Sequence, residues 1–185
     1  MDFALTKPQE FLKRSAHQFA EREVVPVVKQ IEREDKIPDE LLPKMARQGI
    51  FGITADRKYG GGGGTYFDLV LVLEELAQVS TGVAFLALVH SLPTTLLRRH
   101  GNEKQKDEFL PALARGAKIG SFVFTEPGTG SDPNLITSTA REENGYFVLN
   151  GTKRFCSNAT FDGTVGIAVR DGDGISNFIM DKKIE

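Results

Sequence analysis

Apolar residues recur at helical spacing through most of the first 116 residues. Thr6 and Gln9 fit a capping box, with Pro8 tolerated in the first turn, and the pattern then predicts a helix to about residue 33. Further helices are expected over residues 39–49, 65–77, 83–93 and 102–116. The 65–77 helix has so few polar positions that it should be buried nearly all round, and Pro93 should kink or end its helix.

From residue 118 the pattern changes to period two, with β-rich composition and turn pairs such as Asn144-Gly145 between the apolar runs. Strands are expected over residues 120–125, 136–140, 146–149, 153–157, 165–170 and 176–180. A run of helices followed by a run of strands predicts the α+β class. We expect an all-helical domain over residues 1–116 and a small antiparallel β-barrel-like domain over residues 117–185.

Composition and charge limit the classes of function. Lys and Arg total 23 and Asp and Glu total 25, so the net charge of −2 argues against nucleic acid as the main partner. Cys156 is the only cysteine, which excludes an intrachain disulfide and favours a reducing compartment. Val83–Val89, the longest purely apolar run, falls far short of the roughly 20 residues that a membrane span needs. The N-terminus lacks the features of a secretory signal or a transit peptide, so a cytoplasmic location is predicted.

The densest candidate for chemistry is Phe122–Asp132, where an expected strand enters a turn, in a stretch with two glycines, three hydroxyls and two carboxylates. The glycines let another molecule approach the main chain, and Thr125 and Ser131 can hydrogen-bond it. Such a loop suits a polar planar ring or a pyrophosphate, and an ordinary glycine-containing turn is the alternative. It is not a Rossmann fingerprint, because the third glycine is missing, and Gly60–Gly64 is not a phosphate-binding loop, because no Gly-Lys-Ser/Thr follows it. We interpret the glycine run as a flexible connector.

The second candidate is the segment from Asn150 to Asn158. A hairpin turn is expected to lead into a strand whose Phe155 and Ser157 share one face, with Cys156 towards the core. A ring beside a hydroxyl suits a flat cofactor, whereas an aromatic core contact and a solvated serine are the alternative. The three histidines have no ligand-like spacing, so no metal site is predicted.

Together these segments resemble the acyl-CoA dehydrogenase family of flavoproteins over essentially the whole chain. Thr125-Glu-Pro-Gly-Thr-Gly-Ser-Asp132 is similar to the family's signature loop, and Asn150–Asn158 is similar to its second flavin-contacting strand. Glu74–Ala77 and Gly101–Lys106 resemble helical segments that precede them. The two predicted domains would then be the family's N-terminal and middle domains.

The resemblance implies an FAD enzyme that oxidises an acyl-CoA thioester to the trans-2-enoyl-CoA. A carboxylate removes the α-proton while a hydride passes from the β-carbon to flavin N5. Ser131 would also reach the CoA portion of the substrate. The family often has Trp at the position of Phe155 and Thr at that of Ser157. Carried over by position, the flavin contacts are Phe122, Phe124, Thr125, Gly130, Ser131, Phe155 and Ser157.

The resemblance also implies an electron-transfer flavoprotein as electron acceptor and a homo-oligomeric state. The family's C-terminal helical bundle, which carries the glutamate base, has no counterpart in this sequence. We therefore assign no catalytic base and expect the chain alone to be inactive, with Glu126 and Asp132 holding the turn. A flavin oxidase or monooxygenase of the same fold, and a non-catalytic flavin- or acyl-CoA-binding module, are the alternatives.

Overall fold

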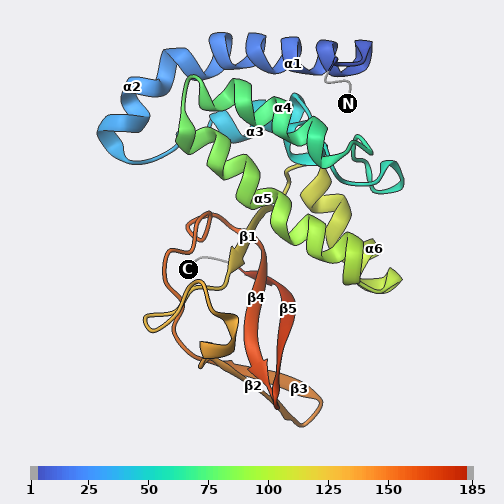
Figure 1. Cartoon of the computed structure of the whole chain (residues 1–185), viewed down its shortest axis with the longest axis vertical. Helices are drawn as coiled ribbons and strands as arrows, with labels where there is room; N and C mark the ends of the chain where they lie inside the picture. The colour runs from blue at the N-terminus through green and yellow to red at the C-terminus, as the bar shows by residue number, and fades with distance from the viewer. Residues whose placement is uncertain (1–3, 183–185) are drawn as a thin grey trace.

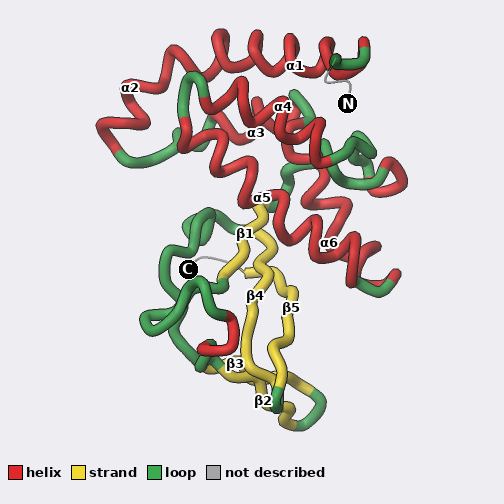
Figure 2. Tube along the Cα trace, in the orientation of Figure 1, coloured by secondary structure: helices red, strands yellow, loops and turns green. Residues whose placement is uncertain are grey.

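In the computed structural model, which describes residues 4–182, helices form one lobe and strands a second (Figure 1). Helices and strands are segregated along the chain and in space, as Figure 2 shows. The helical lobe contains α1 (Lys7–Phe19), α2 (Val25–Glu34), α3 (Leu41–Arg47), α4 (Tyr66–Ala77), α5 (Thr81–His100) and α6 (Glu103–Ala114). The sheet lobe contains β1 (Ile119–Val123), β2 (Thr139–Glu143), β3 (Tyr146–Asn150), β4 (Gly163–Asp171) and β5 (Gly174–Lys182).

Side-chain caps fix where several helices begin. The capping box predicted at Thr6 is confirmed, since its side chain accepts from the Gln9 backbone and the Gln9 side chain accepts from the Thr6 backbone. The start of α4 has the same arrangement between Thr65 and Asp68. A π-helical turn separates α1 from α2 just before Pro26, which has no N–H to donate into the helix.

Of the two outcomes expected at Pro93, an end of the helix is excluded, because α5 continues through it to His100. One further expectation about the helices is wrong. α4 is not buried all round: Leu76 is fully buried, but Val70 is 55% exposed. The helix is covered by α1 and α5, and the face between them stays open. Apolar composition alone did not reveal this, because it does not say how many neighbours a helix has.

The junction between the lobes is a buried contact of α5 with β1. His90 on α5 lies at its centre, where its Nδ1 accepts from the Gly120 N–H at 3.0 Å. Its Nε2 must then carry the proton, which it donates to the Leu113 carbonyl oxygen at 3.2 Å. Burial lowers the pKa of His90 from 6.5 to about 4, so the ring is neutral at neutral pH.

The sheet is mixed and open, so the expected antiparallel barrel-like arrangement is wrong. β4 pairs parallel with β1 and antiparallel along its whole length with β5. β2 and β3 form an antiparallel hairpin that joins β4 through one parallel pair, Thr139 with Arg170. Since β5 occupies one edge of β4, β1 and β2 share the other edge end to end, which leaves room for a loop between them.

Two of the expected strands differ from the structure. The strand expected over residues 136–140 lies later, as β2, because residues 133–135 form a 3₁₀ turn. The strand expected over residues 153–157 does not exist, and this segment is irregular. Within residues 4–182 no helix is long and apolar enough to cross a membrane.

The Gly60–Gly64 run is fixed rather than flexible. Three of its N–H groups donate to carbonyl oxygens of residues 52–55 at 2.7–2.8 Å. A Cβ atom on Gly61 would lie 2.2 Å from the Ala55 carbonyl oxygen, so only glycine fits there.

Candidate functional site

The Thr125–Asp132 loop leaves the end of β1 and turns back sharply. Glu126 and Thr129 exchange backbone hydrogen bonds of 2.9 and 3.2 Å, which closes a tight turn over Pro127 and Gly128. The Thr129 hydroxyl donates to the Asp132 carbonyl oxygen at 2.6 Å. The loop is therefore a defined structure at the position where the sequence predicted a binding loop.

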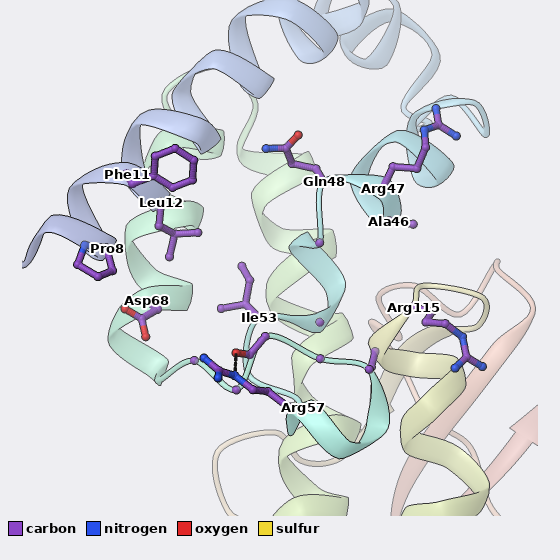
Figure 3. A pocket seen from close by; sticks show the side chains of 18 residues that line it. Pro8, Phe11, Leu12, Ala46, Arg47, Gln48, Ile53, Arg57, Asp68 and Arg115 are labelled. Atoms are coloured by element: carbon purple, nitrogen blue, oxygen red, sulfur yellow. Dashed lines mark hydrogen bonds between the residues drawn. The ribbon is translucent and has the colours of Figure 1, made fainter.

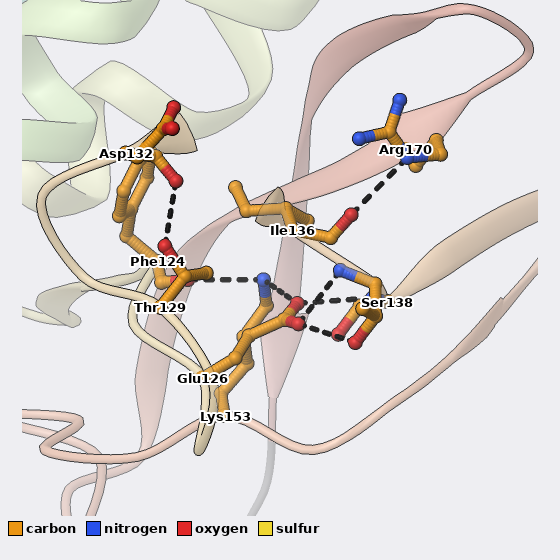
Figure 4. Close-up of polar contacts among 9 residues, drawn as sticks. Phe124, Glu126, Thr129, Asp132, Ile136, Ser138, Lys153 and Arg170 are labelled. Atoms are coloured by element: carbon orange, nitrogen blue, oxygen red, sulfur yellow. Dashed lines mark hydrogen bonds and ion pairs between the residues drawn. The ribbon is translucent and has the colours of Figure 1, made fainter. Parts of the chain in front are cut away.

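Glu126 holds this loop to the rest of the sheet lobe (Figure 4). Its buried carboxylate accepts from the Thr137 N–H at 2.7 Å, the Thr137 hydroxyl at 2.6 Å and the Ser138 N–H at 3.0 Å. Lys153 Nζ donates to the same carboxylate at 2.8 Å and to the Phe124 carbonyl oxygen at 3.1 Å. Burial alone would raise the pKa of Glu126, but these hydrogen bonds outweigh it and hold the pKa well below its usual range.

Arg170 of β4 fixes the far end of the loop. Its guanidinium donates to the Ile136 carbonyl oxygen at 3.1 Å and to the Asn134 carbonyl oxygen at 2.6 Å. Asp132 also has its partners, since its Oδ1 accepts from both the backbone and the side-chain nitrogen of Asn134. Both carboxylates of the loop are thus engaged in holding the turn, as their expected structural role requires.

Other polar groups of the loop are left open. The hydroxyls of Thr125 and Ser131 have no hydrogen-bond partner among residues 4–182, and neither do the N–H groups of Gly130 and Ser131. No atom comes within 4 Å of a Cβ built on Gly128. The loop therefore presents unpaired donors and an uncovered backbone on the same stretch of chain.

The second candidate segment lies directly beside this loop. The Arg154 N–H donates to the Thr125 carbonyl oxygen at 2.8 Å, which joins the two segments through their backbones. Because the segment is not a strand, Phe155 and Ser157 do not share a pleated face, and Cys156 is only half-buried. Phe155 instead has a left-handed backbone, with φ of 54°, and its side chain is 83% exposed.

A bulky residue with positive φ is unfavourable, and such strain concentrates at functional sites. The Ser157 hydroxyl has no partner among the described residues. Phe122 and Phe124 are half-buried on β1 and its continuation, with ring centroids 6.3 Å apart. The seven predicted flavin contacts therefore lie on two segments that touch, one from each candidate region.

These groups fit a flavin nucleotide. An exposed aromatic ring suits a flat ring system, and unpaired hydroxyl and N–H donors suit the polar edge of that ring or a pyrophosphate. In the described part of the chain, no group of three or more His, Cys, Asp or Glu side chains is arranged to hold a metal ion.

Sequence reasoning missed two residues that build the site. Lys153 begins the strand expected over residues 153–157, and the sequence assigns it no role, whereas in the structure it pairs with Glu126. Asn158 has a left-handed backbone and bonds the helical lobe. The sequence feature that could have indicated this backbone conformation is the residue type, since Asn tolerates positive φ better than other non-glycine residues.

A separate cavity of about 860 Å³ lies in the helical lobe beside the glycine run (Figure 3). Its walls combine glycine backbone with apolar side chains such as Phe11 and Ile53, and Arg47, Arg57 and Arg115 also line it. None of the predicted flavin contacts lines this cavity. The chemistry predicted from sequence therefore lies on the sheet lobe, away from this cavity.

Comparison with known proteins agrees with this α+β class. The family model described as "Acyl-CoA dehydrogenase, N-terminal domain" matches residues 6–117, and "Acyl-CoA dehydrogenase, middle domain" matches residues 121–185. The chain belongs to the acyl-CoA dehydrogenase family.

Individual relatives support the assignment. The short-chain specific acyl-CoA dehydrogenase of Clostridium acetobutylicum is 38% identical, over 98% of this chain and 50% of its own length. The CarC subunit of the caffeyl-CoA reductase-Etf complex of Acetobacterium woodii is 36% identical, over 97% of this chain and 49% of its own. A glutaryl-CoA dehydrogenase of Mycobacterium smegmatis, solved in complex with FADH2, superposes with a TM-score of 0.90 at 29% identity, covering 96% of this chain and 46% of that one. The chain thus spans about half the length of the relatives it matches.

Proposed function

We propose that this chain forms the flavin-contacting half of an FAD-dependent acyl-CoA dehydrogenase. The observation that carries the proposal is the contact between the two candidate segments, which brings unpaired hydroxyls and an exposed, left-handed Phe155 to one place on the sheet lobe. Membership of the family supports FAD as the cofactor, as does the relative that was solved with FADH2.

Each site residue has a proposed role. Phe122, Phe124 and Gly130 border the flavin, and the Thr125 hydroxyl bonds its ring. Ser131 bonds the cofactor and the CoA portion of the substrate. Phe155 stacks on the flavin and the Ser157 hydroxyl bonds it. FAD bound there would supply the acceptor for the hydride of the acyl β-carbon, and the role of these residues would be to bind and orient the cofactor and to exclude water.

No carboxylate of the loop is free to remove the substrate's α-proton. Glu126 is engaged by four hydrogen bonds and has a lowered pKa, and Asp132 accepts twice from Asn134. We therefore infer that neither of these two carboxylates is the catalytic base. The 185-residue chain should not turn over acyl-CoA with an artificial electron acceptor, and measurable turnover would contradict this.

The remaining features are proposed from the family. An electron-transferring flavoprotein is the proposed redox partner, which the name of the CarC relative supports. That name also supports an alternative, in which the enzyme runs the same reaction in the opposite direction, as a reductase. Domain limits at residues 1–116 and 117–185, a homo-oligomeric full-length protein and a cytoplasmic location stay predictions.

The test is an FAD titration followed by flavin fluorescence. Thr125→Ala and Ser131→Ala each remove a hydroxyl and should weaken binding about fivefold, because one net hydrogen bond contributes about 1 kcal/mol. Thr81→Ala, an exposed threonine of the helical lobe, is the matched control and should leave the affinity unchanged. Saturable binding that none of these variants alters would contradict the proposed site.

A further inference from the structure

Asn158 connects the Phe155–Ser157 segment to both lobes of the molecule. Its side-chain Nδ2 donates to the Leu86 carbonyl oxygen of α5 at 3.0 Å and to the Gly120 carbonyl oxygen of β1 at 2.9 Å. Both partners are acceptors, so the amide must point its NH₂ group at them, and the two bonds use both of its hydrogens. One half-buried side chain thus ties three segments that are far apart in sequence.

The backbone of Asn158 is also unusual, with φ of 61°. Phe155 has φ of 54°, so two left-handed non-glycine residues lie within four positions. A left-handed backbone is unfavourable for residues other than glycine, less so for Asn than for a bulky aromatic residue such as Phe155. This shape persists only where surrounding contacts hold it.

Those contacts lie at the two ends of the segment. At the N-terminal end, Lys153 donates to the Phe124 carbonyl oxygen and to the Glu126 carboxylate, and the Arg154 N–H donates to the Thr125 carbonyl oxygen. At the C-terminal end, Asn158 bonds α5 and β1. Between these anchors the ring of Phe155 is 83% exposed. The ring is therefore held in place by its neighbours in sequence rather than by burial.

The anchor point on β1 is itself rigid. The Gly120 N–H donates to His90 Nδ1 at 3.0 Å, while its carbonyl oxygen accepts from Asn158. A Cβ on Gly120 would lie 2.6 Å from the His90 carbonyl oxygen and 2.7 Å from Pro93 Cγ. α5 and β1 therefore meet in direct backbone contact at the residue to which Asn158 is bonded.

We propose that Asn158 is a positioning residue: it pins the Phe155–Ser157 segment to α5 and β1, so that Phe155 and Ser157 meet the flavin in a preset geometry. The effect on flavin binding rests on the proposed function. The hydrogen bonds by which Asn158 holds the segment do not require a bound ligand. Binding is tighter when a contact surface is ordered beforehand, since less conformational freedom is lost on association.

The test compares Asn158→Gly with Asn144→Gly. Both asparagines have positive φ, so glycine relieves strain in each, but only Asn158 loses hydrogen bonds. Asn144 lies in the exposed turn between β2 and β3 and is the matched control. The first readout is the rate at which Cys156, the only thiol, reacts with a chromogenic disulfide reagent. The second is the FAD dissociation constant with the visible spectrum of bound flavin.

Asn158→Gly should raise the Cys156 reaction rate at least about fivefold, because loss of two hydrogen bonds frees the segment to open. It should also weaken FAD binding about tenfold and alter the flavin spectrum, with the thermal unfolding midpoint recorded alongside. Asn144→Gly should change neither quantity. Asn158→Asp keeps the shape of the side chain but removes its NH₂ donor, so it should change both quantities in the same direction. It replaces Asn158→Gly if the glycine variant does not unfold cooperatively.

An unchanged Cys156 rate would overturn the pinning. A faster Cys156 rate with unchanged FAD affinity and spectrum would overturn the positioning of the flavin contacts. If the unaltered chain binds no FAD, the proposed half-site fails in this chain, and the Cys156 rate alone then decides whether Asn158 pins the segment.

Discussion

Glu126 and His90 are both buried and ionisable, but Glu126 is charged whereas His90 is neutral. Glu126 stays charged because four hydrogen bonds, one from Lys153, compensate its lost hydration. His90 stays neutral, because its two partners are one donor and one acceptor, which only the neutral ring satisfies. The first residue shapes the loop, and the second joins the lobes behind it.

Glu126→Gln should destabilise the protein by about 3 kcal/mol, because it leaves Lys153 buried without its counter-charge. The measurement is chemical denaturation, with the change read from the midpoint at constant slope. Glu142→Gln, on the exposed side of β2 and without an ion pair among the described residues, should change stability by less than about 0.5 kcal/mol. Equal effects of the two variants would show that the buried pair does not hold the loop.

Stability should also depend on pH through His90. Its pKa is about 4 in the folded chain and 6.5 when unperturbed, so the unfolded state binds more protons between these values. The neutral His90 ring contributes about 3 kcal/mol to the free energy of unfolding above pH 6.5. This contribution is lost progressively as the pH falls towards 4. His90→Gln should flatten this part of the profile of unfolding free energy against pH, whereas exposed His100→Gln should keep it. A profile that His90→Gln leaves unchanged would refute the argument.

At the scale of elements, local signals located the helices better than the strands. Capping residues such as Thr6 marked helix starts correctly because a cap is a contact within four residues. The 153–157 segment alternates like a strand, but contacts distant in sequence give it its irregular shape: Lys153 to Glu126, and Asn158 to Leu86. The two candidate segments could thus be located from the motif, whereas the left-handed backbone of Phe155 and Asn158 could not.

The glycine run shows the same dependence on distant contacts. Gly61→Ala should destabilise the protein by about 2 kcal/mol or more, since the new Cβ would lie 2.2 Å from the Ala55 carbonyl oxygen and the backbone must move. Gly82→Ala in α5, where the nearest atom is 3.8 Å away, should be neutral or stabilising by up to about 1 kcal/mol. Thermal unfolding of the two variants distinguishes them, and a tolerated Gly61→Ala would mean that the run is as flexible as its composition suggests.

At the scale of the molecule, the 185-residue chain leaves an apolar face open along α4 and α5. Phe67, Val70, Phe85 and Leu88 are between 38% and 55% exposed. Exposed apolar patches of this kind mark contact surfaces. We expect the chain to self-associate through this face, and Val70→Ser with Phe85→Ser should shift sedimentation towards the monomer. Tyr146→Ser, at an exposed position on the distant hairpin, should not; association that the double variant leaves intact would place the interface elsewhere.

We propose that FAD binds across the two touching segments of the sheet lobe. The decisive measurement is of the amide chemical shifts of the ¹⁵N-labelled chain while FAD is added. We expect the largest changes at Thr125, Gly130, Ser131, Phe155 and Ser157, and none in the glycine run beside the helical cavity. Changes confined to Gly60–Gly64 and the cavity around Arg57, with the five site amides unmoved, would contradict the claim.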